Sequence, residues 1–471
     1  MANNDAVMPD ELGSRTRHVE TSLAIVDFVL DTNFENLSAE AIKYLKIYIM
    51  DTLAVGVAGR CSAGSDILLK AVETWGWGEQ SRVIGMPGMR AAAPTAAFLN
   101  GYNIHALEWD GLHEYSVVIA LCVPMAAMMA EADQNPVSGT DFLAAFCVAV
   151  EVAVTLGGAS KTAPRFFRPA VAGLMGAAMG IAKMRGYSRK RTLQVLGLAY
   201  SQASGTMQAH WEGVMMLAMQ VGVSARAAIC AADMAAAGAQ APIDVLLGKF
   251  GFFTLMETAN NIDASLAAMG GAGQNVWKIT ETAHKPYPAG RATQSVLTMF
   301  NDIFSKHKID VSGIEEIKVE VPPLIMLLVG RPLTESMTSS YARLCLKYVG
   351  PMWLLNGKVD PRLYPEGEGA SDEIKELGER FNIVLNDITD PNALGPQSCT
   401  IKMKSGQKYS AFCDIPYGSP GNRMNKTARE DKVRMCFEVG DRQANPQALI
   451  DAVEMIEDMK DIRELFSTVC D

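Results

Sequence analysis

The sequence predicts a mainly α-helical protein, a large all-helical domain with a smaller α/β domain inserted near its C-terminal end. Apolar residues recur at spacings of three and four positions up to about residue 275. Near Thr280 the pattern changes to the alternation of polar and apolar residues that is typical of strands, and helical spacing returns close to the C-terminus. With 471 residues, of which 49% are hydrophobic and 20% charged, the chain is long enough for more than one domain.

The segments of the helical domain start with residues suited to helix N-termini. "SAEAIKYLKIYIMDTLAVGVAG" starts at Ser38 and "SGTDFLAAFCVAVEVAVTLGGA" at Ser138. A serine in this position accepts a hydrogen bond from a first-turn amide, and the glycines at the far ends tolerate a left-handed cap. The longest apolar run, 117–130, contains Pro124 and falls short of the ~20 residues that cross a bilayer. We therefore expect a buried helix there and no membrane partner.

The inserted domain is predicted from strands that alternate with helices. "GIEEIKVEVPP" and "CTIKMKSGQKYSAFCDI" have strand alternation, and the second contains a Ser-Gly turn between two strands. "ATQSVLTMFNDIFSKH" and "SYARLCLKYVGPMWLLNG" lie between them and have helical spacing. Strands interleaved with helices in this way are typical of an α/β domain.

The chain returns to helical spacing after the break "YGSPGNRMNK", in "REDKVRMCF" and "PQALIDAVEMIEDMKDIRELFSTV". We expect these last helices to rejoin the first domain. The predicted organisation is a first helical part over residues 1–278, the α/β domain over 279–414 and the returning helices over 415–471.

Composition excludes several classes of partner and cofactor. A net charge of -10 without any run of Lys or Arg argues against nucleic-acid binding. The polar first twenty residues lack the apolar core of a secretory signal, so a cytoplasmic location is expected. The nine cysteines form no CxxC pair and are predicted to be free thiols. GxGxxG, GxxxxGK[ST] and HExxH motifs are absent, and His210 has no second ligand at metal spacing, so no cofactor and no metal site are predicted.

The stretch "HALEWDGLHE" places His105, Glu108, Asp110 and His113 close together. If 92–109 is one helix, His105 and Glu108 lie three positions apart on one face. A histidine beside carboxylates can act as a base near neutral pH. The alternative is a solvated helix end whose acidic residues happen to neighbour a histidine.

Two further segments carry candidate residues. "HKPYPAGRATQ" places Lys285 and Arg291 around two prolines just before a helix, where an anion could bind, although a rigid linker between domains explains it equally well. "SYARLCLKYVG" places Arg343 and Tyr348 on a predicted helix. Its alternative interpretation is an amphipathic helix with a solvated basic edge.

Seven segments in order resemble the MmgE/PrpD family: "NGYNIHALEWDGLHE", "RPAVAGLMGAAMG", "ASGTMQ", "GKFGFF", "KPYPAGRATQ", "ARLCLKYV" and "PYGSPGNRM". The resemblance extends along nearly the whole chain. It implies a helical domain made by the N-terminal part and the C-terminal tail, an inserted α/β lid, and a homodimer. It further implies a cleft between body and lid for a small carboxylic-acid substrate, and proton transfer at carbon without metal, flavin or nucleotide.

The resemblance also implies residue roles. Lys285 corresponds to the family's lid lysine, a proton donor or acceptor, and Tyr348 to its lid tyrosine, a hydrogen-bonding catalytic residue. Arg291 and Arg343 correspond to basic positions that could clamp a carboxylate. His105 and Asp110 match the family's H-x-L-D-x-D pattern.

The sequence departs from the family pattern at several polar positions. Glu108 stands where aspartate is usual, and Gly111 and Leu112 follow Asp110 where an aspartate and, in some members, a threonine are expected. The expected His-Pro site reads Ile119-Ala120.

Three more departures concern other segments, and they are Leu217 in place of a lysine, Gln294 in place of a histidine, and Phe167-Arg168 at an FHPT-like site. These changes predict a more apolar pocket and a substrate with fewer carboxylates and more hydrocarbon. Arg168 is predicted to bind substrate, as are His105 and Glu108. His113 is predicted to replace the missing histidine as catalytic base, beside Asp110.

The predicted activity is that of a cofactor-independent lyase, a dehydratase or decarboxylase, acting on a small polycarboxylate by proton transfer next to a carboxylate. Two alternatives remain open, an epimerase or other isomerase using the same proton abstraction and a non-catalytic metabolite-binding member. All of these depend on Lys285 and Tyr348 facing His105, Asp110 and His113 across one cavity.

Overall fold

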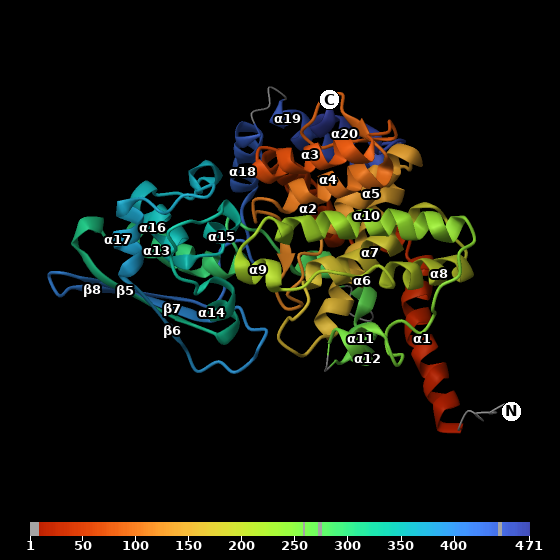
Figure 1. Ribbon diagram of the computed structural model, residues 1–471, viewed down its shortest axis with the longest axis horizontal. Helices are drawn as coiled ribbons and strands as arrows, with labels where there is room; N and C mark the ends of the chain where they lie inside the picture. The colour runs from red at the N-terminus through yellow and green to blue at the C-terminus, as the bar shows by residue number, and fades with distance from the viewer. Residues whose placement is uncertain (1–8, 258–259, 272–275, 441–444) are drawn as a thin grey trace.

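The computed structural model describes residues 9–257, 260–271, 276–440 and 445–471, and it confirms the predicted fold class. A large helical body carries a smaller α/β domain at one side, and this domain is referred to below as the lid (Figure 1). The helices of the body's first part are α1 (Pro9–Asp31), α2 (Ala39–Gly59), α3 (Ala63–Trp75), α4 (Ala93–His105), α5 (Cys122–Gln134), α6 (Gly139–Ala159), α7 (Arg168–Met184), α8 (Arg189–Tyr200), α9 (Gln208–Glu212), α10 (Met216–Ala236), α11 (Phe252–Leu255) and α12 (Ile262–Ala267).

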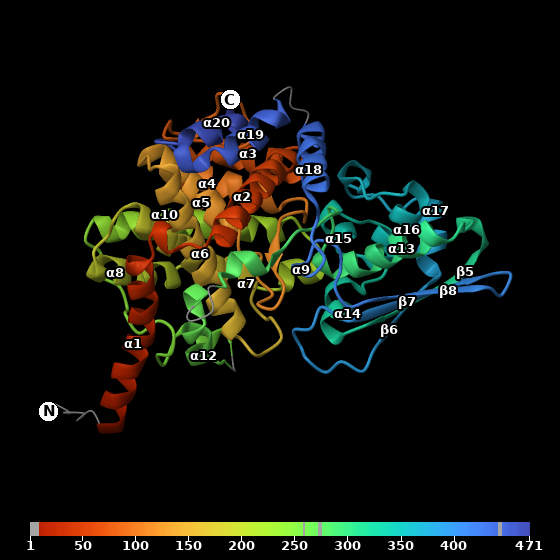
Figure 2. The ribbon, with the colours of Figure 1, turned by 180° about the vertical axis from the view of Figure 1, so that it is seen from behind.

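The last helices of the chain lie against the first ones. They are α18 (Lys426–Val439), α19 (Pro446–Glu454) and α20 (Arg463–Cys470), and Figure 2 shows them beside α2 and α3. Their apolar side chains, from Val433 to Cys470, belong to the same hydrophobic core as those of α2, α4 and α6. Both chain ends therefore contribute to the body.

Local sequence signals account for several helix ends. The Ser38 side chain accepts a hydrogen bond from the Ala41 amide, and the Ser138 side chain accepts one from the Asp141 amide, as predicted. Small residues let α6 and α7 pack closely. A Cβ added at Gly176 would lie 2.3 Å from the Ala149 carbonyl oxygen, so only glycine fits there.

Among the residues that the structure describes, one helix, α6, is long and apolar enough to cross a membrane, and 94% of its most apolar window is buried by its neighbours. Such burial is typical of a core helix. The run 117–130 forms a helix only from Cys122, because residues 114–121 adopt turns and an irregular loop.

The lid has its own hydrophobic core around a four-stranded sheet in the order β6-β5-β7-β8. The strands are β5 (Ile314–Val321), β6 (Phe381–Leu385), β7 (Gln397–Met403) and β8 (Lys408–Cys413). β5 pairs with β6 in parallel and with β7 antiparallel, and β7 pairs antiparallel with β8. β6 was not predicted, since its five residues show no clear alternation of buried and exposed positions.

The helices of the lid cover one face of this sheet (Figure 1). They are α13 (Gln294–Lys306), α14 (Pro323–Val329), α15 (Ser339–Arg343), α16 (Leu346–Asn356) and α17 (Asp372–Glu379). There are also two short antiparallel strand pairs, β1 (Ser81–Arg82) with β2 (Arg90–Ala91) and β3 (Leu112–His113) with β4 (Thr282–Ala283). The second pair brings the start of the lid segment beside the loop that follows α4.

Candidate active site

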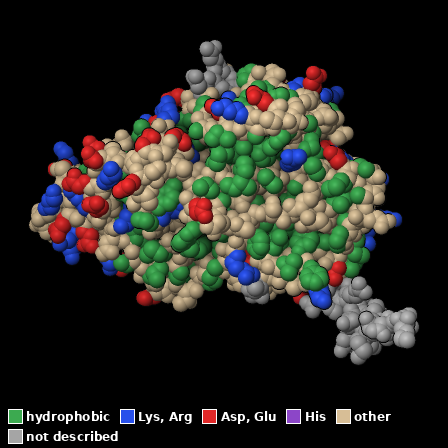
Figure 3. Space-filling model, in the orientation of Figure 1, with side chains coloured by type: hydrophobic (Ala, Val, Ile, Leu, Met, Phe, Trp, Pro, Cys, Tyr) green, Lys and Arg blue, Asp and Glu red, His purple; other side chains and the backbone are tan. Residues whose placement is uncertain are grey.

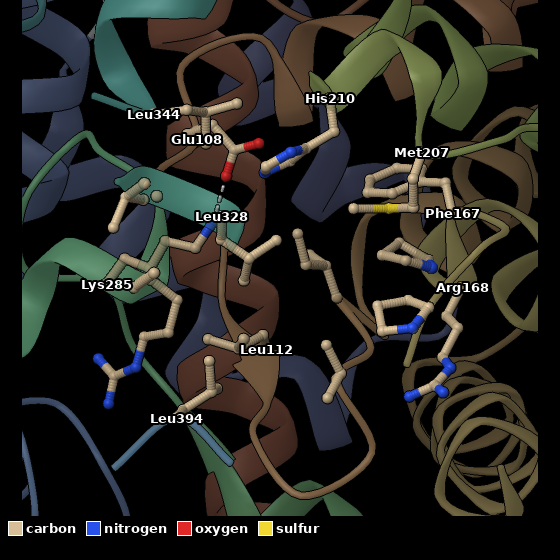
Figure 4. Close-up of a pocket in the computed structure, with 18 residues that line it drawn as sticks. Glu108, Leu112, Phe167, Arg168, Met207, His210, Lys285, Leu328, Leu344 and Leu394 are labelled. Carbon is tan, nitrogen blue, oxygen red and sulfur yellow. Dashed lines mark hydrogen bonds and ion pairs between the residues drawn. The ribbon is translucent and has the colours of Figure 1, made fainter. Parts of the chain in front are cut away.

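A pocket lies between the helical body and the lid, with about 650 Å³ of empty space that is partly open to solvent. Most of its wall is apolar, as Figure 4 shows. The apolar side chains include Leu112, Ile119, Phe167 and Met207 from the body and Leu328, Leu344 and Leu394 from the lid. Glu108, Lys285 and His210 form its polar end.

The loop after α4 brings three of the predicted residues together. α4 ends at His105, four residues earlier than predicted, and Glu108 takes a left-handed backbone conformation with φ of 52°. Such a conformation is uncommon for a residue other than glycine and is typical of functional sites. The chain turns back there, so that a Glu108 carboxylate oxygen lies 3.1 Å from His105 Nε2. On its other side, His105 Nδ1 lies 3.0 Å from an Asp110 carboxylate oxygen.

Lys285 joins this group from the start of the lid segment. Its ammonium donates to Glu108 at 2.9 Å and lies 3.6 Å from Asp110. Pairing of β4 with β3 fixes the preceding residues, and Trp109 Nε1 donates to the Pro286 carbonyl oxygen at 3.2 Å. We call Asp110, His105, Glu108 and Lys285 the charged cluster.

All members of the charged cluster are ionised. Burial alone would lower the pKa of His105, but Asp110 and Glu108 raise it to about 10. Burial likewise opposes the charged form of Lys285, yet Glu108 and Asp110 raise its pKa. The two cations hold the carboxylate pKa values below their ordinary range despite burial, that of Glu108 well below. The cluster therefore has two positive and two negative charges.

Among the described residues, His105, Asp110 and Cys122 bring three potential metal-ligand atoms within 4.8 Å of one another. The Asp110 carboxylate is already paired with two cations, and burial raises the pKa of the Cys122 thiol well above its ordinary value. Metal ligands need the thiolate form, so these residues fit an ion-pair network better than a metal site.

Two of the arginines that were predicted to bind substrate line the pocket, but their guanidinium groups are already bonded to other protein groups. Arg168 contacts Glu257 at 3.0 Å and donates to Asn392 at 3.0 Å. Arg291 contacts Glu114 at 2.8 Å and donates to the His284 carbonyl oxygen at 3.1 Å. Both arginines therefore hold body and lid together in this structure.

Three of the predicted residues lie outside both the pocket wall and the charged cluster. His113 lies 3.3 Å from Glu281 and lines a separate surface hollow. The Tyr348 hydroxyl donates to the Leu363 carbonyl oxygen at 2.9 Å within the lid core. Arg343 is buried and donates to the Ala106 carbonyl oxygen at 3.0 Å, at the C-terminus of α4. The structure thus brings Lys285 to His105 and Asp110, but not Tyr348 or His113.

Three of the departures from the family pattern lie in the pocket wall and make it more apolar. They are Leu112, Ile119 and Phe167. Leu217 and Gln294 do not line it. His210, which was considered only as a metal ligand, is a pocket residue that spacing did not reveal. Its hydrogen-bond partner, Arg331, comes from the lid, and no local sequence pattern points to this contact.

Comparison with known proteins gives matches along most of the chain. The MmgE/PrpD N-terminal domain matches residues 23–265, and the MmgE/PrpD C-terminal domain matches residues 287–457. Cis-aconitate decarboxylase of Mus musculus is 26% identical over 449 residues, which cover 90% of this chain and 88% of the relative. That of Homo sapiens is 26% identical over 443 residues, 90% and 89% of the two chains. The cis-aconitate decarboxylase-like protein oryM of Aspergillus oryzae is 23% identical over 472 residues, 94% and 96%.

Proposed function

Because the chain belongs to the MmgE/PrpD family, we propose that it is a cofactor-independent lyase that decarboxylates a small unsaturated polycarboxylate bearing an apolar arm. The relatives named above are cis-aconitate decarboxylases or similar to them, which favours decarboxylation over dehydration or epimerisation. The observation that carries the proposal is the buried charged cluster at the polar end of an apolar pocket.

In the proposed reaction, the bond between a substrate carbon and one carboxylate breaks and carbon dioxide leaves. The electron pair stays on carbon and spreads into the conjugated, retained carboxylate. Lys285 then donates a proton to this carbon, because it and Glu108 line the pocket, whereas His105 and Asp110 lie behind them. Because its neighbouring carboxylates keep Lys285 protonated, the ammonium has a proton to give when the more basic carbanion forms.

The other members of the cluster position Lys285. The Glu108 carboxylate lies between His105 and Lys285, at 3.1 and 2.9 Å, and so directs the ammonium toward the pocket. Asp110 keeps His105 protonated, and the imidazolium in turn keeps Glu108 ionised. An ionised, preorganised group of this kind needs little rearrangement during the reaction.

The apolar wall supports an apolar arm on the substrate. Much of the pocket wall consists of apolar side chains, so few polar groups are left to bind further carboxylates. These side chains are Leu112, Ile119, Phe167, Met207 and Leu394. Each buried methylene contributes about 0.8 kcal/mol, which is about fourfold in affinity. We expect kcat/KM to rise by about this factor for each methylene added to the arm, until the pocket is full.

The test is turnover in deuterated water, followed by proton NMR, of cis-aconitate and of analogues in which an alkyl chain replaces one carboxylate arm. Loss of carbon dioxide with deuterium at one carbon supports the decarboxylase. Exchange with inversion would identify an isomerase, and binding without exchange a non-catalytic protein. Lys285→Met should lower kcat by about 10²- to 10⁴-fold. The exposed lid lysine Lys306, changed to Met, is the matched control and should keep full activity.

We also propose that the protein is a homodimer. The face of the helical body in Figure 3 carries many apolar and few charged side chains. Exposed apolar side chains of the body occur on α3, α9 and α10 and in the segment after α10, and they include Ile67, Trp75, Trp211, Met216 and Phe250. Large exposed apolar patches are typical of subunit interfaces. Light scattering of wild type and of Trp211→Glu tests this, and a wild-type monomer would contradict it.

A cytoplasmic location is proposed as well. None of the nine cysteines, all of which lie in the described part of the chain, forms a disulfide, and Cys61 is exposed. Free thiols, buried or exposed, persist in a reducing compartment. Fractionation of cells that produce the tagged protein tests the location, and recovery in a secreted or membrane fraction would contradict it.

A further inference from the structure

His210 is a pocket residue that the mechanism above does not use. It lies on the short helix α9, is only 7% exposed and lines the polar end of the pocket. In Figure 4 its ring points toward Glu108, next to the Lys285 ammonium. The charged groups that act on it are Arg331, Glu108 and His105.

Arg331, from the lid, determines which ring nitrogen of His210 carries the proton. Its Nη2 donates to the His210 carbonyl oxygen at 2.8 Å and lies 3.4 Å from Nδ1 of the same residue. A guanidinium has donors only, so Nδ1 must be the acceptor. In a neutral imidazole the proton is then on Nε2, the nitrogen left free to face the pocket.

The imidazole of His210 is neutral at pH 7. Burial, and then the positive charge of Arg331, lower its pKa to about 4. His105 is the opposite case, because its carboxylate neighbours raise its pKa to about 10. At pH 7 the neutral His210 therefore lies beside a cluster whose members are charged.

Arg331 has no carboxylate partner among the residues that the structure describes. Its guanidinium lies 4.8 Å from the centre of the Tyr341 ring, and its Nη1 is buried without a hydrogen-bond partner. A partly buried cation without a counter-ion favours a nearby anion. Arg331 thus contributes positive potential behind His210, whereas Arg168 and Arg291 are neutralised by Glu257 and Glu114.

We propose that His210 is a catalytic residue that touches the substrate, and that its Nε2–H donates a hydrogen bond to an oxygen of the retained carboxylate. Arg331 is the positioning residue that fixes this tautomer. When carbon dioxide leaves, negative charge moves onto the contacted oxygen, and the hydrogen bond stabilises it. His210 keeps its proton while Lys285 gives its proton to carbon. This inference rests on the proposed decarboxylation.

The kinetic test compares three variants. His210→Leu removes the donor and should lower kcat by about 100-fold with little change in KM. His210→Gln keeps an N–H near the position of Nε2 and should recover most of that loss. His307→Gln, an exposed lid histidine, is the control and should match wild type. Full kcat in His210→Leu would overturn the proposal, and so would equal losses in the Leu and Gln variants.

The second test does not require turnover. The six histidines are labelled with ¹⁵N, and His210 is assigned by its absence in His210→Gln. We expect a neutral, Nε2-protonated ring at pH 7 whose resonances shift when maleate is added, and loss of the single tautomer in Arg331→Met. A charged ring, an Nδ1-protonated ring or no response to maleate would refute the assignment. If no acid is turned over but these shifts appear, the proposed reaction fails and the His210 contact stands.

Discussion

The charged cluster makes stability depend on pH, and His105→Gln tests that dependence. Raising the pKa of His105 from 6.5 to about 10 corresponds to about 5 kcal/mol, at about 1.36 kcal/mol per pKa unit. Removing one partner from a buried ion-pair network costs about 3–5 kcal/mol, which agrees. We therefore expect the free energy of unfolding at pH 6 to fall by about 3–5 kcal/mol in the variant.

The sign of the pH dependence follows from the raised pKa. Between pH 6.5 and about 10 the folded protein holds a proton that the unfolded chain releases. His105 therefore makes its full contribution to the free energy of unfolding below pH 6.5. This contribution is lost, by up to about 1.4 kcal/mol per pH unit, as the pH rises to about 10. The His105→Gln variant should not lose stability in this way. The difference in free energy of unfolding between wild type and variant should therefore become smaller as the pH rises.

Urea unfolding followed by far-UV circular dichroism, at intervals from pH 6 to pH 10, measures both quantities. His307→Gln serves as the control, because that side chain is exposed and lies on the lid. Parallel stability profiles for wild type and His105→Gln over this range would refute the reasoning, since they would mean that His105 is not held as an imidazolium.

Three further expectations concern other parts of the site. Tyr348→Phe should cost about 1 kcal/mol of lid stability and leave kcat within twofold, since the hydroxyl bonds inside the lid core, and a tenfold loss of kcat would contradict this. Arg168→Met should cost about 3–5 kcal/mol by leaving Glu257 buried and unpaired, and the double variant with Glu257→Gln should recover most of it. A change in KM alone would make Arg168 a substrate ligand instead. Ile119→Ser should lower kcat/KM about tenfold for alkyl-bearing acids but not for cis-aconitate, and equal losses for both would contradict an apolar subsite.

Part of the candidate site could be predicted from the sequence. His105, Glu108 and Asp110 lie within six positions, so their proximity could be predicted even though the helix ends at His105 and a left-handed turn supplies the contact. The contribution of Lys285, 177 positions from Glu108, came from family resemblance. No spacing rule could give this contact, because it depends on the β3–β4 pairing.

Contacts between distant segments also explain why some predicted site residues have other partners than expected. Arg168 and Arg291 were plausible carboxylate clamps by residue type, but Glu257 and Glu114 occupy them. A guanidinium binds any carboxylate that the fold brings close, and a sequence does not say which one that will be. Tyr348 likewise turns into the lid core, where the Leu363 carbonyl oxygen accepts its hydrogen bond.

The sequence by itself determined the fold class, the helix starts at Ser38 and Ser138, and the apolar character of the pocket at Leu112 and Ile119. These features depend on short-range periodicity, local hydrogen bonds and side-chain type. Tertiary structure alone decided which charges pair, which histidine is charged and which is neutral. Ionisation depends on burial and on charges within a few ångströms, and those neighbours come from segments far apart in the chain.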